Sequence, residues 1–451
     1  MKRRPRLFLV VVLSLLASLS IAYPIKEIKG QKRTWTVPGD YLTIDQAIIA
    51  AEEGDTILVS EGEYSGFLID KQLTIVGTGR NKTKVISPVI IEGSNAKLMR
   101  MNIDPSLSKD YGPTIQVEGR NNQIIGNNFV GKILVMNDNN LFQDNYISEG
   151  YQSHISASNN KFYRNTFENN GVSIFIGSNN EFVENNFYSE RGHCLHITTD
   201  RNLIFDNTFE NVYEFLYCVG LSGASDIVIS CNQFKSIAPC ISLGDLAYDN
   251  QILYNKLEGD KSKNSIGIEI TSLCSDNTDI IGNTIKNCYI GILISQTTNT
   301  GKILSNNFID NEIQAQDNSN GVTWFYNRTG NFWNDWVSPD DNHDGIVDNP
   351  YVVPGEARGV DKYPLETRYI YNPEQPTESE EQTEPESADE EDSLFSVNVS
   401  IEILLAILAV GVIIAVAILT LGRSIGVTET DEDNSDKRAN WKTKISTLYQ
   451  L

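Results

Sequence analysis

Apolar and polar residues recur along the chain in one short phrase, at intervals of 18 to 28 residues. The clearest copies are NNQIIGNNF from residue 121, NNLFQDNYI from 139, NNKFYRNTF from 159, NNEFVENNF from 179 and RNLIFDNTF from 201. Weaker copies end at Phe234, Leu257, Ile285 and Phe308. The inner asparagines of these copies are Asn127, Asn145, Asn165, Asn185, Asn207, Asn232, Asn255, Asn283 and Asn306. An apolar residue lies three positions before each of them and another lies two positions after it.

This repeat predicts an all-β fold, a parallel β-helix of about a dozen coils. Each copy contains short β-runs such as SIFIG, LHIT and IGILI, separated by Asn, Ser and Gly. Neighbouring coils would pair their backbones at a spacing of ~4.8 Å, which gives a rod of roughly 55 to 60 Å. We expect the asparagines to form an inward column that hydrogen-bonds along the stack, with stacked Phe side chains beside it.

Both ends of such a stack need a cover, because unpaired strand edges invite association. Residues 43–51 (TIDQAIIAA) predict an N-terminal capping helix, with Thr43 and Gln46 as a capping box and one apolar face. At the other end, residues 321–365 are rich in aromatic residues, with Trp324, Phe332, Trp333 and Trp336. We therefore assign residues 35–330 to the β-helix and 331–371 to a C-terminal cap.

Two long apolar runs lie outside the repeats. Residues 1–22 combine basic residues, an apolar run and small residues at a cleavage position, which predicts a signal peptide. Residues 401–422 contain 19 uncharged apolar positions, Ile403–Leu421, which is long enough to cross a bilayer. An acidic, Pro-rich stalk at 372–400 and a cytoplasmic tail at 423–451 complete a single-pass cell-membrane protein with its β-helix outside the cell.

Charge and sequons refine this picture. The formal net charge of −23 argues against a nucleic-acid partner, since such surfaces need clustered Lys and Arg. Sequons at Asn81, Asn327 and Asn398 would be open to glycosylation outside the cell.

An Asp-rich loop in the C-terminal cap is a candidate metal site. Asp340, Asn342, Asp344, the Ile346 carbonyl and Asp348 match the first part of a Ca²⁺-binding loop. Position 12, however, is Tyr351 instead of a bidentate Glu, so a solvated acidic turn is the alternative. Asp361 would complete the ligand set.

Three cysteines form a second candidate. If their strands alternate regularly, Cys194, Cys218 and Cys240 point outward on three successive coils. His196 would project from the same face, with His154 in its column two coils earlier. Such a column offers a soft ion such as Cu(I) its preferred ligands, but an oxidising exterior favours a disulfide, and packed thiols are a third reading.

The outward positions also suggest a polysaccharide groove, since polar side chains and Tyr residues suit an extended glycan. The outward polar positions are Gln116, Glu118, Gln152, His154, Glu269, Glu312, Gln314 and Gln316. The tyrosines in or beside turns are Tyr151, Tyr188, Tyr213, Tyr217 and Tyr248. An ordinary solvated sheet face would look similar.

Two segments resemble a known family. VPGDYLTIDQAIIAAEEGDTILVSEGEYSG resembles the entry of right-handed β-helix proteins related to pectin-degrading enzymes. The Asn-rich coils and the ending GNFWNDWVSPDDNHDGIVDNPYVVPGEARGVDKYPL resemble the NosD-like, carbohydrate-binding and sugar-hydrolase (CASH) group, over residues 35–365. The resemblance implies a right-handed β-helix in the periplasm or on the cell surface. NosD relatives assist maturation of the copper site of nitrous oxide reductase, and others are linked to polysaccharides.

We therefore expect a membrane-anchored β-helix that binds carbohydrate or another surface component without catalysis. A polysaccharide lyase or glycoside hydrolase with an Asp/Glu pair on the outward face is one alternative. A copper-binding accessory protein that uses the Cys and His column is the other.

Overall fold

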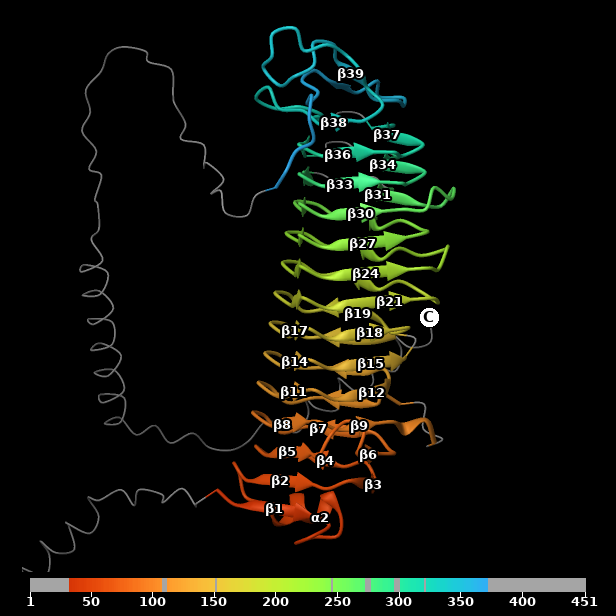
Figure 1. The fold of residues 1–451 in the computed structure, drawn as a ribbon. Coiled ribbons are helices and arrows are strands. Elements are labelled where there is room, and N and C mark those ends of the chain that lie inside the picture. Colours follow the sequence, from red (N-terminus) through yellow and green to blue (C-terminus); the bar gives the residue numbers. More distant parts are fainter. Residues whose placement is uncertain are drawn as a thin grey trace, which may run out of the picture. The chain divides into compact units, whose positions relative to one another are not determined.

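The structure, a computed structural model, describes residues 32–107, 112–150, 152–244, 246–271, 277–295, 301–319 and 322–371. Three parallel sheets of 13, 12 and 13 strands wrap around one core, and their coils stack along a common axis (Figure 1). The predicted all-β parallel β-helix is confirmed, and so is its size of about a dozen coils.

Each coil contributes one strand to each of three sheets, which we name A, B and C in accordance with their pairing. Sheet A contains β1 (Thr34–Val37), β2 (Thr56–Val59), β5 (Thr74–Gly77), β8 (Lys97–Met99), β11 (Gln123–Ile125), β14 (Leu141–Gln143), β17 (Lys161–Tyr163), β20 (Glu181–Val183), β23 (Leu203–Phe205), β26 (Val228–Ser230), β29 (Gln251–Leu253), β32 (Asp279–Ile281) and β35 (Ile303–Leu304). Sheet B contains β3 (Gly62–Tyr64), β6 (Thr83–Val85), β9 (Asn102–Ile103), β12 (Asn128–Gly131), β15 (Tyr146–Glu149), β18 (Thr166–Glu168), β21 (Asn186–Ser189), β24 (Thr208–Asn211), β27 (Gln233–Ser236), β30 (Lys256–Glu258), β33 (Thr284–Lys286), β36 (Asn307–Ile309) and β38 (Phe332–Trp333). Sheet C contains β4 (Leu68–Ile69), β7 (Val89–Ile91), β10 (Ile115–Val117), β13 (Ile133–Val135), β16 (Gln152–Ser156), β19 (Gly171–Ile176), β22 (Leu195–Ile197), β25 (Val219–Leu221), β28 (Ile241–Leu243), β31 (Ile266–Ile270), β34 (Ile290–Ile294) and β37 (Ile313–Asp317).

A ladder of buried asparagines forms the sharp corner between sheets A and B. From Asn145 onward, the Oδ1 atom of each ladder asparagine accepts from the backbone N–H and from Nδ2 of the asparagine one coil earlier, at 2.8 to 3.2 Å. Each Nδ2 group also donates a hydrogen bond to a strand carbonyl. For example, Nδ2 of Asn185 donates to the Phe162 carbonyl at 2.8 Å. The ladder contains all nine asparagines that the repeat predicts, and Asn331 extends it by one coil.

Aromatic rings stack inside the coils beside this ladder, as predicted. Phe167, Phe187, Phe209 and Phe234 form one column with ring centroids 4.6 to 4.8 Å apart. A second column contains Phe142, Phe162 and Phe182, at 5.0 and 4.8 Å. These spacings equal the coil repeat, so the rings follow the backbone pairing.

The N-terminal end is covered by the short helix α2 (Ile44–Ala50), in agreement with the sequence prediction. The Thr43 side chain accepts from the backbone N–H of Gln46 at 3.2 Å, and Ile44, Ala47 and Ile48 are buried against the first coil. The helix ends one residue earlier than expected, at Ala50.

The C-terminal end is closed by the cap that follows sheet B, which includes the antiparallel pair β39 (Tyr351–Val352) and β40 (Val360–Asp361). Trp333 stacks between Phe308 and Tyr351, with ring centroids 4.3 and 4.0 Å away. The carboxylate of Asp361 accepts from the backbone N–H of Asn331 at 2.7 Å and from the Trp333 indole at 2.9 Å. Asp361 therefore ends the asparagine ladder.

The predicted signal peptide, stalk, membrane segment and cytoplasmic tail lie outside the described residues. Among the residues that are described, no helix has the length and apolar character needed to span a bilayer.

We predict that Asn185→Ala lowers the free energy of unfolding by roughly 3 kcal/mol, because it leaves two donors of Asn165 and the Phe162 carbonyl without partners inside the core. Urea unfolding followed by circular dichroism measures the loss. The exposed neighbour Asn186 is the matched control, since Asn186→Ala should change stability by at most ~0.5 kcal/mol. Equal losses in the two variants would contradict a stabilising role for the ladder.

Candidate functional site

The outer face of sheet C carries one straight column of outward side chains. Pairing of consecutive strands sets its order as Leu68, Ile90, Gln116, Leu134, His154, Ser173, His196, Gly220, Ser242, Glu269, Leu293 and Gln316. The expected placement of His154 and His196 in one column, two coils apart, is therefore confirmed. Gln314 is buried instead of outward, and its amide bonds to Asn311 and Asn334.

Four aromatic rings form a row along this face, one per coil: His154, Phe175, His196 and Tyr217, which we call the aromatic row. Successive ring centroids lie 5.4, 6.5 and 5.9 Å apart. Phe175 joins the row because the register between β16 and β19 shifts at this point, which is a β-bulge, and Phe175 is 45% exposed. The row spans roughly 14 Å along the rod axis, since each coil advances by ~4.8 Å.

The Tyr217 ring is held flat on the sheet. A Cβ atom added to Gly220 would lie 2.0 Å from the Tyr217 ring, so only glycine leaves room for the ring over this strand. The Tyr217 hydroxyl shares a 2.7 Å hydrogen bond with Nδ1 of His196. Tyr217 comes from the turn between sheets B and C, which rises beside the sheet and gives the row one wall.

His193, from the preceding turn between sheets B and C, supplies polar contacts beside the row. Its ring lies 5.6 Å from the His196 ring and 5.9 Å from the Tyr217 ring. Its Nε2 atom shares a 3.2 Å hydrogen bond with the Ser173 hydroxyl, to which Gln152 also donates. The row is thus bordered by hydroxyl, amide and imidazole groups, which can exchange hydrogen bonds with a polar ligand.

Burial keeps these groups uncharged near neutral pH. It lowers the pKa of His193 to about 4, with a smaller contribution from His196, and it lowers the pKa of His196 and raises that of Tyr217. Further along the column, burial raises the pKa of Glu269, whose carboxylate accepts from the Ser242 hydroxyl at 3.4 Å. The site therefore combines neutral rings with one carboxylate three coils after His196.

The cysteines lie inside the coil stack, so the predicted outward orientation of Cys194, Cys218 and Cys240 is wrong. Each is at most 2% exposed. The reason is local: β22 begins at Leu195, β25 at Val219 and β28 at Ile241, so strand alternation does not extend back to the thiols, which lie beneath the turn from sheet B. They do form a column of free thiols. Contact with Cys218 and burial raise the pKa of Cys194, and burial raises that of Cys240.

Side chains of the Asp-rich loop accept hydrogen bonds from backbone N–H groups of the same loop. Oδ2 of Asp340 accepts from the N–H of Gly345 at 2.8 Å, and Oδ1 of Asn342 accepts from that of Asp344 at 2.9 Å. Asp344 also forms a 2.7 Å ion pair with Arg328. The remaining expected ligands, the Ile346 carbonyl and the exposed Asp348, lie in the same loop, whereas Asp361 is taken up by the end of the ladder. Calcium binding stays a prediction.

The two described sequons differ in accessibility. Asn81 is exposed in the turn between β5 and β6, but the Thr83 hydroxyl of its sequon is buried and donates to the Ser60 carbonyl at 3.0 Å. Asn327 is exposed in the turn between Tyr326 and Thr329. Asn398 lies outside the described residues. Glycosylation stays a prediction at all three.

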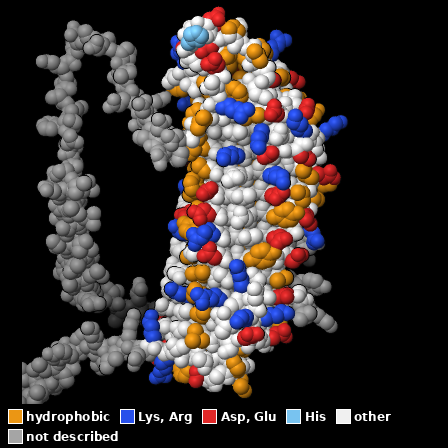
Figure 2. All heavy atoms as spheres, in the orientation of Figure 1, with side chains coloured by type: hydrophobic (Ala, Val, Ile, Leu, Met, Phe, Trp, Pro, Cys, Tyr) orange, Lys and Arg blue, Asp and Glu red, His pale blue; other side chains and the backbone are white. Residues whose placement is uncertain are grey.

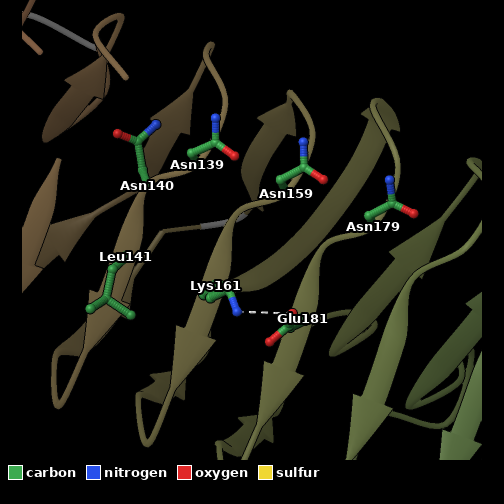
Figure 3. Close-up of a pocket in the computed structure, with 7 residues that line it drawn as sticks. All are labelled: Asn139, Asn140, Leu141, Asn159, Lys161, Asn179 and Glu181. Carbon is green, nitrogen blue, oxygen red and sulfur yellow. Dashed lines mark ion pairs between the residues drawn. The ribbon is translucent and has the colours of Figure 1, made fainter. Parts of the chain in front are cut away.

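A hollow of about 280 Å³ lies at the turns that enter sheet A. Figure 3 shows Asn139, Asn159 and Asn179 pointing the same way from successive turns, beside the 3.1 Å ion pair of Lys161 with Glu181. These side chains are polar and largely exposed, and no aromatic ring lines the hollow. It is therefore a weaker candidate for ligand binding than the aromatic row.

Residues 219–338 match the family model described as periplasmic copper-binding protein (NosD). Over these residues the β-helix is similar to the NosD family. No curated protein sequence matches it.

Solved structures of other proteins are also similar to this chain. The A-module of the mannuronan C-5 epimerase AlgE4 of Azotobacter vinelandii is 16% identical, with a TM-score of 0.51 over 62% of this chain and 93% of that one. At this identity the match shows the fold alone. A PL6 family polysaccharide lyase of Pseudopedobacter saltans is 12% identical over 67% of this chain and 83% of its own, with a TM-score of 0.41. The catalytic domain of a GH87 α-1,3-glucanase is 13% identical over 69% and 71%, with a TM-score of 0.44.

The copper in the family description can be tested against the side chains of this chain. Cys194, Cys218 and Cys240 are buried in the stack. His154 and His196 lie on its outer face and are two coils apart, with Ser173 between them. Within the described ranges, no three His, Cys, Asp or Glu side chains are placed to hold one ion. The residues that the structure describes therefore do not fit a copper centre.

Sequence reasoning found His154 and His196 in one column and named Tyr217 among the tyrosines suited to a glycan, but it did not bring these residues together as one site. Phe175 was assigned to an ordinary strand, and His193 and Tyr217 lie in turns whose path the repeat does not define. One signal was available, since the members of the aromatic row follow one another at a constant interval of 21 residues.

We predict that the stability of the protein falls as the pH drops from 6.5 to about 4. In this window the unfolded chain binds a proton at residue 193 and the folded chain does not, so acid favours unfolding, by up to about 3 kcal/mol from this group. Thermal melting above and below the window should show a smaller loss in His193→Gln than in the unchanged protein. The exposed His343 provides the control, because His343→Asn should leave the pH dependence as it is. The same loss in all three proteins would contradict the prediction.

Proposed function

We propose that this protein is displayed on the cell surface, where it binds an extended polysaccharide along the outer face of sheet C without cleaving it. The aromatic row is the observation that carries the proposal. Aromatic faces stack on the apolar faces of sugar rings, and the bordering hydroxyl, amide and imidazole groups pair with sugar hydroxyls.

The direction and spacing of the row favour a chain-like ligand. The rings follow one another along the rod axis, so a ligand that contacts all four must lie across the strands. Each coil advances by ~4.8 Å, close to the length of one pyranose unit, so one sugar can meet one coil. A small isolated ligand would not use this repetition.

The chemistry of the face favours binding over hydrolysis. A glycosidase of the common type needs two carboxyl groups about 5 to 9.5 Å apart. Among the twelve positions of the column that carries the aromatic row, Glu269 is the single carboxylate. Surface display rests on the predicted signal peptide and membrane segment, which place the β-helix outside the cell where polysaccharides are found.

Affinity electrophoresis of the full chain against neutral and acidic polysaccharides tests this function. We expect retardation by at least one of them, and a roughly tenfold weaker affinity in Tyr217→Ala, since one stacked ring contributes about 1 to 1.5 kcal/mol. Tyr326→Ala is the control, because Tyr326 is exposed, at 41%, and lies in the turn between Tyr326 and Thr329, outside sheet C.

Two results would count against the proposal. Binding that Tyr217→Ala leaves unchanged would remove the aromatic row from the site. New reducing ends or unsaturated sugars after incubation with the polysaccharide would show catalysis and favour the lyase or hydrolase alternative.

A further inference from the structure

The outer face of sheet A carries an unbroken line of outward positions that no function so far uses. Twelve consecutive strands contribute one residue each, and their neighbours in the strands point into the core. We call this line the apolar strip: Leu58, Val76, Met99, Ile125, Gln143, Tyr163, Val183, Phe205, Ser230, Leu253, Ile281 and Leu304. Ten of the twelve are apolar, whereas outward positions of a solvated sheet are normally polar.

Figure 2 shows hydrophobic side chains in a line along the left edge of the stack, where Figure 1 places sheet A. Leu58 and Phe205 are 43% and 39% exposed, and the strip between them is partly exposed throughout. Beyond Phe205, Leu253 and Ile281 are partly exposed, whereas Ser230 and Leu304 are buried. Eleven steps of ~4.8 Å give a length of roughly 53 Å, and three residues of strand give a width of roughly 10 Å. Two such faces would bury about 1,000 Å² in total, which reaches the lower limit for a specific protein interface.

Charged residues beside the strip divide into two halves. The basic ones come mainly from the N-terminal half of the stack, namely Lys97, Arg100, Lys161 and Arg164. The acidic ones come mainly from the C-terminal half, namely Glu181, Glu184, Asp206 and Asp279. There is one exception in each half: Asp144 pairs with Arg164 at 2.9 Å, and Lys302 lies over the Tyr326 ring. The strip thus has a basic end and an acidic end.

We propose that a second copy of this chain covers the apolar strip, in an antiparallel dimer whose twofold axis passes between β17 and β20. This point is the centre of the twelve strands. The antiparallel arrangement sets the basic half of each copy against the acidic half of the other. At the axis, Lys161 of each copy faces Glu181 of the other, and Arg164 faces Glu184.

A parallel arrangement would be repulsive at the same place. A twofold axis along the rod sets the two borders of the strip against each other at equal height, so that Lys161 meets Arg164 and Glu181 meets Glu184. Like charges opposed in this way disfavour a complex, whereas opposite charges fix its register. A second copy also has the same coil spacing, so its side chains can interdigitate with the partly exposed positions of the strip.

Analytical ultracentrifugation of the full chain in detergent measures the association. We expect a concentration-dependent dimer, and a dissociation constant roughly a hundredfold higher in Phe205→Glu, because a carboxylate would be buried against apolar groups. Val337→Glu, at a residue that is 94% exposed in the C-terminal cap, should dimerise like the unchanged protein. Circular dichroism of each variant checks that it is folded.

A mixing experiment tests the antiparallel register. Lys161→Glu and Glu181→Lys each lose the 3.1 Å intramolecular ion pair and should each be monomeric, because like charges meet at the axis. An equimolar mixture of the two should dimerise, since position 161 of one variant then meets the opposite charge at position 181 of the other. A monomeric unchanged protein, a dimer that survives Phe205→Glu, or a mixture that stays monomeric would overturn the proposal.

Discussion

The asparagine ladder is the interaction on which the rest of this structure depends. A chain that turns sharply between two short strands leaves backbone N–H and C=O groups in the interior, where water cannot satisfy them. Each ladder amide accepts from the coil before it and donates to a carbonyl of that coil, so the corner satisfies its own polar groups. The residue before each asparagine supports the bend with a positive φ, for example 55° at Asp144 and 56° at Glu184. Because the ladder fixes the corners, only every second residue of a strand has to be buried in the core.

The alternate positions are therefore free to differ from face to face. Sheet C carries neutral rings with polar borders, and sheet A carries the apolar strip. Sheet B is marked by ion pairs between neighbouring coils, such as Lys235 with Glu210 and Lys286 with Glu258, both at 2.9 Å. Because all three faces share one backbone repeat, side chains of each type form a line along the rod. Binding surfaces on this scaffold are consequently long and narrow.

Sequence was a good guide to the fold because the interior repeats. The Asn and Phe positions recur with the backbone, and so they reveal the strands, the corners and the stacked rings. It was a poorer guide to the outer site, because turns of different length deliver its residues. Tyr217 follows a long connection from β24, and no periodicity places its ring over Gly220. Cys194 was predicted to point outward but is buried. It lies one residue before its strand, where alternation no longer sets the direction of a side chain.

Asp361 gives the stack a definite end. A ladder asparagine both accepts from one coil and donates to the other, whereas an ionised carboxylate only accepts. The N–H groups of Asn331 meet such a group and the relay stops there. The cap therefore depends on the hydrogen-bonding groups of the last coil and not on the number of coils before it. Whole coils could be gained or lost by duplication or deletion in the interior, and the reach of the molecule would change in steps of ~4.8 Å while both ends stayed the same.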